Sequence, residues 1–203
     1  MTARNRSPVA TGKKRLLIVD DHPMMREGLA QLINQEADLT VCGQAGSSRE
    51  ALELTAKLKP ELLLADISLP DKSGLELIKD LQALHPGLPV LVISMHDESL
   101  HAERVLRAGG RGYIMKQEGG KKMMEAIRQV LAGKVYVSEK MSAQFLESFS
   151  GQRSKADQSP VESLTDRELE VFRLIGQGKG TRQIAQGLHL SVKTVEVHRA
   201  HIK

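Results

Sequence analysis

The sequence predicts an α/β domain with a doubly wound, five-stranded parallel sheet, followed by a small all-α domain. Five short apolar runs alternate with five segments of helical period, as in a sheet whose strands are joined by helices. Several runs are continuously apolar, for example Leu16–Val19 and Val90–Ile93, which is typical of parallel strands covered on both faces. From Leu164 onward the apolar residues recur at helical spacing.

The expected strands and helices follow in order from local signals. A proline opens the first helix, Ser47 or Ser48 caps the second, and glycines close the third, fourth and fifth. The predicted strands are 15–20, 39–45, 61–65, 89–94 and 111–115, and the predicted helices are 23–35, 49–58, 74–84, 98–108 and 120–131. A brief extended segment is expected at 135–137, and one or two helical turns at 141–149.

Four regions are predicted along the chain. They are a disordered basic tail at 1–14, the α/β domain at 15–132, a linker at 133–160 whose stretch 151–160 is polar and flexible, and the helical domain at 161–203. The single cysteine excludes an internal disulfide. No apolar run approaches the roughly 20 residues of a membrane span, and none suits a signal peptide, so a cytoplasmic protein is expected.

Charge is distributed unevenly over the chain, whose net charge is +4. Residues 13–140 carry 18 basic and 18 acidic side chains, whereas residues 176–203 carry five basic side chains and one acidic one. A basic end of this kind suggests a nucleic-acid partner, although a solvated helical face would have the same charge.

Polar residues follow the predicted strands at the edge where ligands bind in open α/β sheets. Asp20 and Asp21 follow the first strand, Asp66 the third, Ser94 ends the fourth and Lys116 follows the fifth. Crowded carboxylates repel one another by roughly 3 kcal/mol per pair at about 5 Å. Lys116 would offset part of this repulsion, and a hard divalent cation such as Mg²⁺ the rest. A simpler interpretation of Asp20 and Asp21 is that they cap the next helix.

These stretches resemble the receiver domain of two-component response regulators. The matching sequences are LLIVDD at 16–21, LADISLPDKSG at 64–74, VIS at 92–94 and AGGRGYIMK at 108–116. The resemblance implies a flavodoxin/CheY-like fold, in which Asp66 accepts a phosphoryl group from a histidine kinase. It implies that Asp20, Asp21, Asp66 and the backbone carbonyl of Ser68 hold Mg²⁺. It also implies that Ser94 and Lys116 contact the phosphoryl group, and that Ser94 and Tyr113 switch conformation. The residue after Lys116 is Gln117, whereas many receivers have proline at this position.

The C-terminal stretch Leu164–Lys203 resembles the LuxR-type helix-turn-helix of the NarL/FixJ regulators. Its sequence, LTDRELEVFRLIGQGKGTRQIAQGLHLSVKTVEVHRAHIK, predicts helices at 165–175 and 182–188 and a recognition helix from 192. The family continues with the rest of this helix and a fourth helix, so the domain is expected to be incomplete at its C-terminus. The apolar side of the recognition helix is expected to be Val192, Val195 and Ile202, packed on Phe172, Leu174, Ile184 and Leu188.

The resemblance implies promoter DNA as a partner and a homodimer in the phosphorylated state. The predicted DNA contacts are Thr181, Ser191, Lys193, Thr194, Glu196, Val197 and Arg199. Lys193 is expected at phosphate, Glu196 at cytosine and Val197 at a thymine methyl, while Arg199 falls near the apolar stripe. Each of these side chains is also compatible with a solvated helix face.

Three functions remain open on the sequence. The first is a transcription regulator switched by phosphorylation, whose chemistry is limited to phosphotransfer and dephosphorylation at Asp66. The second is a phosphorelay or protein-interaction module with a non-functional DNA-binding end. The third is an aspartyl-phosphate phosphatase, which usually needs an acid two residues after the nucleophile; that position is Ser68, which cannot act as a general acid.

Overall fold

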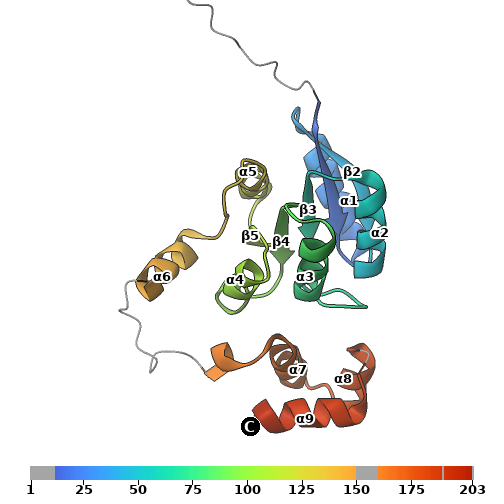
Figure 1. The fold of residues 1–203 in the computed structure, drawn as a ribbon, viewed down its shortest axis with the longest axis vertical. Coiled ribbons are helices and arrows are strands. Elements are labelled where there is room, and N and C mark those ends of the chain that lie inside the picture. Colours follow the sequence, from blue (N-terminus) through green and yellow to red (C-terminus); the bar gives the residue numbers. More distant parts are fainter. Residues whose placement is uncertain (1–11, 150–159, 189, 203) are drawn as a thin grey trace, which may run out of the picture.

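The N-terminal domain is a parallel sheet between two layers of helices (Figure 1). The computed structural model describes residues 12–149, 160–188 and 190–202. Residues 1–11 of the tail predicted at 1–14 and residues 151–159 of the linker stretch predicted at 151–160 lie outside these residues. The strands are β1 Lys14–Val19, β2 Leu39–Ala45, β3 Leu62–Ala65, β4 Val90–Ser94 and β5 Gly112–Met115. The helices of this domain are α1 Pro23–Asn34, α2 Ser48–Leu58, α3 Gly74–Leu84, α4 Glu98–Arg107, α5 Gly120–Leu131 and α6 Glu139–Phe149.

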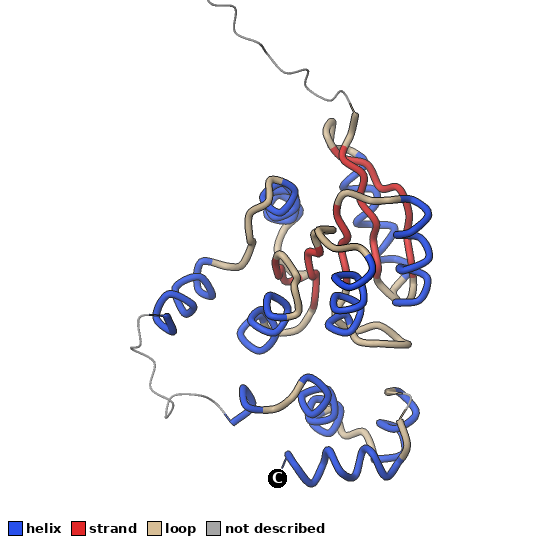
Figure 2. Tube along the Cα trace, viewed as in Figure 1, coloured by secondary structure: helices blue, strands red, loops and turns tan. Residues whose placement is uncertain are grey.

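The sheet has the strand order β2-β1-β3-β4-β5, and every pairing in it is parallel. Alternate residues of each strand point to opposite faces. In β1, Leu17 and Val19 pack with α2, α3 and α4, whereas Leu16 and Ile18 pack with α1 and α5. Helices therefore cover both faces, as Figure 2 shows, and the predicted doubly wound sheet is confirmed.

The segment after α5 packs against the N-terminal domain. Tyr136 forms a parallel bridge with Gly112 at the outer edge of β5, and α6 follows it. Met141 on α6 is buried in the core that contains α3 and α4, and Phe145 is half-buried there. The helix is longer than the one or two turns expected, and it lies within the range predicted as linker.

The C-terminal domain contains a short 3₁₀ turn, Pro160–Ser163, and the helices α7 Asp166–Gly176, α8 Thr181–Gly187 and α9 Val192–Ile202. The side chains of Thr165 and Glu168 form a capping box at the start of α7. The buried core of this domain comprises Val171, Ile184, Ala185 and Val195.

Two residues expected in that core lie outside it, so their assignment was wrong. Phe172 is 42% exposed and Val192 is 40% exposed. Val171, one residue before Phe172, belongs to the buried stripe of α7 instead, and Val192 is the first residue of α9, at the margin of the small core. Three short helices bury only one stripe each, so a neighbouring residue on the same helix remains in solvent.

No helix among the residues described is long and apolar enough to cross a membrane.

Candidate functional site

The polar residues predicted at the strand ends meet at the carboxyl edge of the sheet, next to the adjacent strands β1 and β3. The chain leaves these two strands toward opposite faces of the sheet, which is the position where open α/β sheets bind ligands. Asp20 follows β1 directly and Asp66 follows β3 directly. Asp20, Asp66 and Ser94 are 2%, 5% and 0% exposed, so three polar side chains are buried at this edge.

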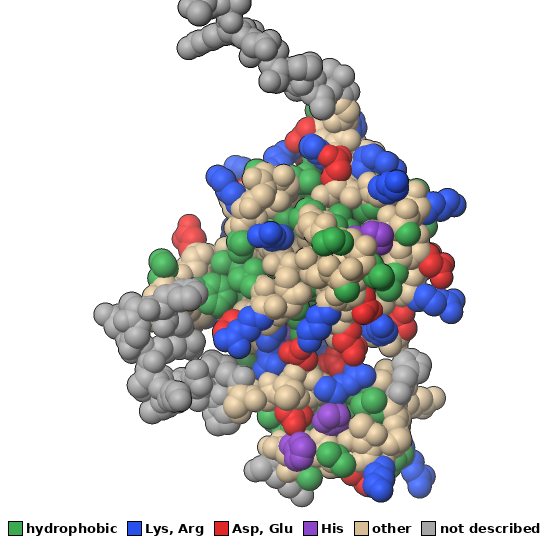
Figure 3. Space-filling model, in the orientation of Figure 1, with side chains coloured by type: hydrophobic (Ala, Val, Ile, Leu, Met, Phe, Trp, Pro, Cys, Tyr) green, Lys and Arg blue, Asp and Glu red, His purple; other side chains and the backbone are tan. Residues whose placement is uncertain are grey.

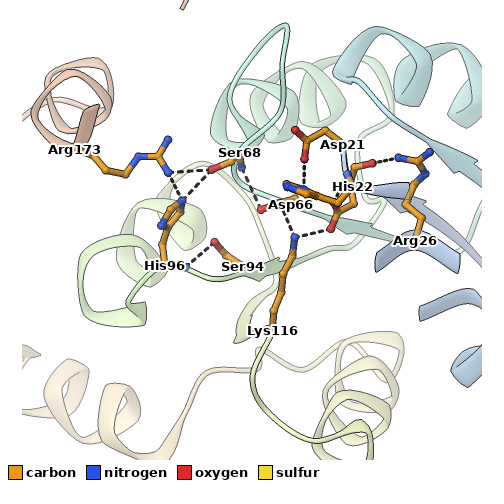
Figure 4. Close-up of polar contacts among 10 residues, drawn as sticks. Asp21, His22, Arg26, Asp66, Ser68, Ser94, His96, Lys116 and Arg173 are labelled. Carbon is orange, nitrogen blue, oxygen red and sulfur yellow. Dashed lines mark hydrogen bonds and ion pairs between the residues drawn. The ribbon is translucent and has the colours of Figure 1, made fainter. Parts of the chain in front are cut away.

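Lys116 joins the two buried carboxylates. Its Nζ donates to Asp20 Oδ2 at 2.6 Å and to Asp66 Oδ2 at 2.7 Å (Figure 4). Burial of the ammonium group lowers the pKa of Lys116, but the bonds to the two carboxylates outweigh this effect and raise it overall. The lysine is therefore fixed in its charged form between the two acids.

Asp66 lies in an environment that disfavours its charge. Burial raises the pKa of Asp66, the neighbouring Asp20 carboxylate adds to the increase, and Lys116 and the Ser68 N–H oppose it. The Ser68 N–H donates to Asp66 Oδ1 at 3.2 Å. A further positive charge at this position would favour the ionised, nucleophilic carboxylate.

The acidic side chains could hold a metal ion together. Ligand atoms of Asp20, Asp21, His22 and Asp66 all lie within 4.8 Å of one another. Three carboxylates form the hard oxygen donor set that Mg²⁺ prefers, so the residues present fit that ion. His22 belongs to this group as well: its Nδ1 contacts Asp21 Oδ1 at 2.5 Å and Asp20 Oδ1 at 3.3 Å.

The two residues predicted as a switch lie on the next strands, at the same edge. Ser94 is fully buried, and its Oγ accepts from the His96 N–H at 3.1 Å. Tyr113 is also fully buried, and its hydroxyl donates to the His96 carbonyl at 2.8 Å. Both side chains thus contact one residue, His96, which follows β4.

Three contacting residues were not identified from the sequence. His96 Nε2 lies 2.9 Å from Ser68 Oγ, and Arg173 on α7 contacts both of these atoms. Burial, together with the charges of Arg173 and Lys116, lowers the pKa of His96 to about 4, so its neutral ring can accept from the arginine. Arg26 donates to the Asp20 carbonyl. The position of His96, two residues after Ser94, could have indicated that it lies at the site. Arg173 is distant in the sequence, and nothing in its local pattern indicates this contact.

The residues predicted to contact DNA lie on and around α9. Lys193, Glu196 and Val197 are exposed on this helix. Ser191 Oγ accepts from the Thr194 N–H at 3.0 Å and lies 2.7 Å from its hydroxyl, so the two form the N-terminal cap of α9. The remaining two are partly buried and contact each other: Arg199 Nη1 donates to Thr181 Oγ1 at 3.3 Å.

Both halves of the chain match known families. Residues 16–128 match the family described as the response regulator receiver domain, and residues 162–203 match the bacterial regulatory proteins of the luxR family. The oxygen regulatory protein NreC of Staphylococcus carnosus is 33% identical over 192 residues, covering 93% of this chain and 88% of that protein.

Solved structures are similar to this chain over one or both domains. RcsB from Salmonella enterica serovar Typhimurium, bound to promoter rprA with a phosphomimetic, has a TM-score of 0.68 and 25% identity, and the match covers 94% of this chain and 91% of that one. A LuxR-family response regulator from Aurantimonas sp. SI85-9A1 has a TM-score of 0.64 and 28% identity, with 68% of this chain and 99% of that one covered. The protein therefore belongs to the two-component response regulators that join a receiver domain to a LuxR-type helix-turn-helix.

Proposed function

We propose that Asp66 is the phosphoacceptor and that its phosphorylation by a histidine kinase controls DNA binding by the C-terminal helices. The observation that supports this most strongly is the position of Lys116, whose ammonium group bonds Asp66 and Asp20 at the carboxyl edge of the sheet. An ion pair of this kind costs desolvation and contributes little net stability, so its presence at the carboxyl edge of the sheet favours a chemical role.

The proposed transfer is a displacement at phosphorus. A carboxylate oxygen of Asp66 forms the new bond to phosphorus while the bond to the donor breaks, and the donor keeps that electron pair. For a phosphohistidine the leaving group is the imidazole, which takes up a proton. In this proposal Lys116 and the Ser94 hydroxyl hold the phosphoryl oxygens as the carboxylate loses its charge.

A divalent cation, in our proposal Mg²⁺, would be held by Asp20, Asp21, Asp66 and the backbone carbonyl of Ser68. When bound, it supplies positive charge that favours the ionised form of Asp66 and neutralises the incoming phosphoryl group. The phosphatase alternative is less well supported, because Ser68 offers a hydroxyl that contacts His96 where such an enzyme has an acid.

The proposed output is regulation of transcription from promoter DNA by a phosphorylated dimer, with Ser94 and Tyr113 responding to the phosphoryl group. Structures of the similar RcsB include promoter complexes and dimers on DNA. Lys193, Glu196 and Val197 are exposed, and we propose that they enter a major groove, where Lys193 contacts a phosphate. Arg199 would contact a phosphate only after releasing Thr181. Promoter DNA places the site of action in the bacterial cytoplasm.

Labelling by acetyl phosphate with Mg²⁺ tests the phosphoacceptor. Wild-type protein should gain one phosphoryl group, which intact-mass spectrometry detects, and Asp66→Asn should gain none. Asp80→Asn, a change at a partly exposed carboxylate paired with Lys72, is the matched control and should label like the wild type. Full labelling of Asp66→Asn would refute the assignment.

Salt-dependent DNA binding tests the output. Lys193→Ala should weaken binding to all promoter fragments about equally and reduce the slope of log affinity against log salt by about 1, because one phosphate contact is lost. A loss confined to particular sequences would mean that Lys193 contacts a base. Weak binding without salt dependence would instead favour the protein-interaction alternative.

A further inference from the structure

Helix α7 of the C-terminal domain lies against the edge of the receiver that carries Asp66. Arg173 Nη1 donates to Ser68 Oγ at 3.3 Å and also contacts His96 Nε2. Ser68 in turn donates its N–H to Asp66 Oδ1. Figure 4 shows Ser68 and His96 between Asp66 and Arg173. An arginine of the DNA-binding domain therefore lies on the outer side of the Asp66, Ser68 and His96 side chains.

A second contact between the domains holds the start of α7. Asp166 Oδ2 accepts from Lys79 Nζ on α3, and Asp166 Oδ1 from Arg104 Nη1 on α4, both at 3.0 Å. Arg104 also donates to the Leu164 carbonyl at 2.5 Å. Burial raises the pKa of Asp166, but the bonds from Lys79 and Arg104 outweigh it and hold the pKa below its usual value. Figure 3 shows acidic and basic side chains facing one another along this junction.

The interface between these two contacts is loosely packed. A cavity of about 280 Å³ lies there, lined from the receiver by Leu69, Leu75 and His101 and from the other domain by Leu169, Leu174 and Leu188. Apolar side chains around a void lose dispersion contacts that a packed interface would supply. Two polar contacts around a cavity make an interface that can separate and re-form.

The docked arrangement leaves the recognition helix accessible. Helix α9 packs on α7 and α8 of its own domain, and in Figure 1 it lies on the far side of α7 from the receiver. Val197 is 47% exposed, and Lys193 and Glu196 are exposed as well. Docking therefore places α7 against Ser68 and His96, next to Asp66, and does not cover the proposed DNA-reading face.

In-line transfer requires the donor to arrive opposite the attacking oxygen of Asp66. Asp66 Oδ2 is held by Lys116, while Oδ1 faces Ser68. With Oδ1 as the attacking oxygen in our proposal, the donor enters from the side that Ser68, His96 and Arg173 occupy. We infer that Arg173 is a gate on phosphoryl transfer: while it bridges Ser68 and His96, the docked DNA-binding domain obstructs the donor, and undocking exposes Asp66. This inference rests on the proposed role of Asp66 as phosphoacceptor.

The test measures the rate at which acetyl phosphate with Mg²⁺ labels the full chain. Arg173→Ala removes the bridge, and Asp166→Asn weakens the remote contact without touching the receiver site. Both should label faster than the wild type, by about tenfold if nine-tenths of the wild-type molecules are docked. The double variant should be no faster than the faster single variant, because one undocking step explains both. Arg182→Ala, an exposed arginine on α8, should leave the rate unchanged.

Small-angle scattering on the same proteins should show a larger radius of gyration for both undocking variants. Slower labelling of Arg173→Ala would mean that the arginine assists transfer, and would overturn the gate. Faster labelling of Arg173→Ala alone, unchanged rates in both, or unchanged scattering would overturn it too. Asp66→Asn separates the two claims: labelling that persists in this variant refutes the phosphoacceptor, whereas its loss together with unchanged rates in the undocking variants refutes only the gate.

Discussion

At the scale of single residues, the ammonium group of Lys116 offsets the repulsion between the two buried carboxylates of Asp20 and Asp66. Asp20 and Asp66 are almost inaccessible to solvent, and each bonds Lys116 Nζ through one oxygen. Without that cation, two carboxylates would face each other away from water. Lys116 thus offsets the repulsion between the two buried acids in the folded receiver, at the site that we propose for the phosphoryl group.

Lys116→Met should lower the free energy of unfolding by about 3 kcal/mol in the absence of Mg²⁺, because removing one member of a buried ion pair leaves its partners uncompensated. Millimolar Mg²⁺ should recover part of the loss by binding the folded acids. Urea unfolding followed by tyrosine fluorescence measures this, since both tyrosines lie in the receiver. Lys122→Met, at an exposed pair with Glu118, is the control and should change little. Equal stability of Lys116→Met and wild type without Mg²⁺ would contradict the prediction.

His101 should make the receiver less stable in mild acid. Burial and the nearby His96 and Arg173 lower the pKa of His101 to about 4, whereas an unfolded histidine has a pKa near 6.5. Between pH 7 and 5.5 the unfolded chain therefore binds a proton that the folded protein does not, and His101 should account for a loss of about 1 kcal/mol. His101→Phe, which keeps a ring beside Tyr113, should lose correspondingly less stability over this range. Parallel pH profiles for the two proteins would exclude this role.

At the scale of elements, the start of α3 is built against the loop that carries Asp66. Gly74 is the first residue of α3, and its N–H donates to the Ile67 carbonyl at 2.8 Å. A Cβ at this position would overlap the Asp66 carbonyl oxygen and lie 2.7 Å from Ile67 Cα. Only glycine allows α3 to approach the loop this closely, so α3 fixes the backbone position of Asp66, the proposed phosphoacceptor.

Gly74→Ala should lower the free energy of unfolding by about 2 kcal/mol, since the added methyl displaces backbone. It should also slow labelling of Asp66 by acetyl phosphate, because the displaced backbone carries the acceptor. Gly28→Ala, within α1 where nothing lies within 4 Å, is the matched change and should stabilise by about 0.5–1 kcal/mol. Urea unfolding followed by tyrosine fluorescence measures the stability of both variants, and labelling by acetyl phosphate measures the rate at Asp66. Unchanged stability and an unchanged labelling rate in Gly74→Ala would show that the loop adjusts freely.

At the scale of the whole molecule, the two domains contact each other through α7, and α9 faces away from the receiver. Docking in this orientation couples the C-terminal domain to events at Asp66 without hiding the recognition helix. In our proposal a change at Asp166, on one side of the interface, therefore affects the proposed phosphoacceptor Asp66 by altering how often the domains are docked.

Undocking alone should consequently have little effect on DNA affinity. Arg173→Ala and Asp166→Asn should bind a promoter fragment within about twofold of the wild-type affinity in the absence of phosphodonor, as measured by fluorescence anisotropy at fixed salt. Lys193→Ala, on the exposed face of α9, should show a clear loss in the same assay. A tenfold gain for the undocking variants would mean that the receiver shields α9.

The sequence by itself determined the receiver fold and the residues at its carboxyl edge. Apolar runs with helical segments between them specify a parallel sheet, and parallel strands bring their C-terminal ends to one edge, so Asp20, Asp66, Ser94 and Lys116 could be placed together from local pattern alone. The tertiary structure decided the rest: which apolar residues of the small domain are buried, how α6 extends the receiver core, and the contact of Arg173 with Ser68 and His96. Such contacts join polar side chains of segments far apart in the chain, and no periodicity in the sequence predicts them, because each of these side chains would be equally acceptable in water.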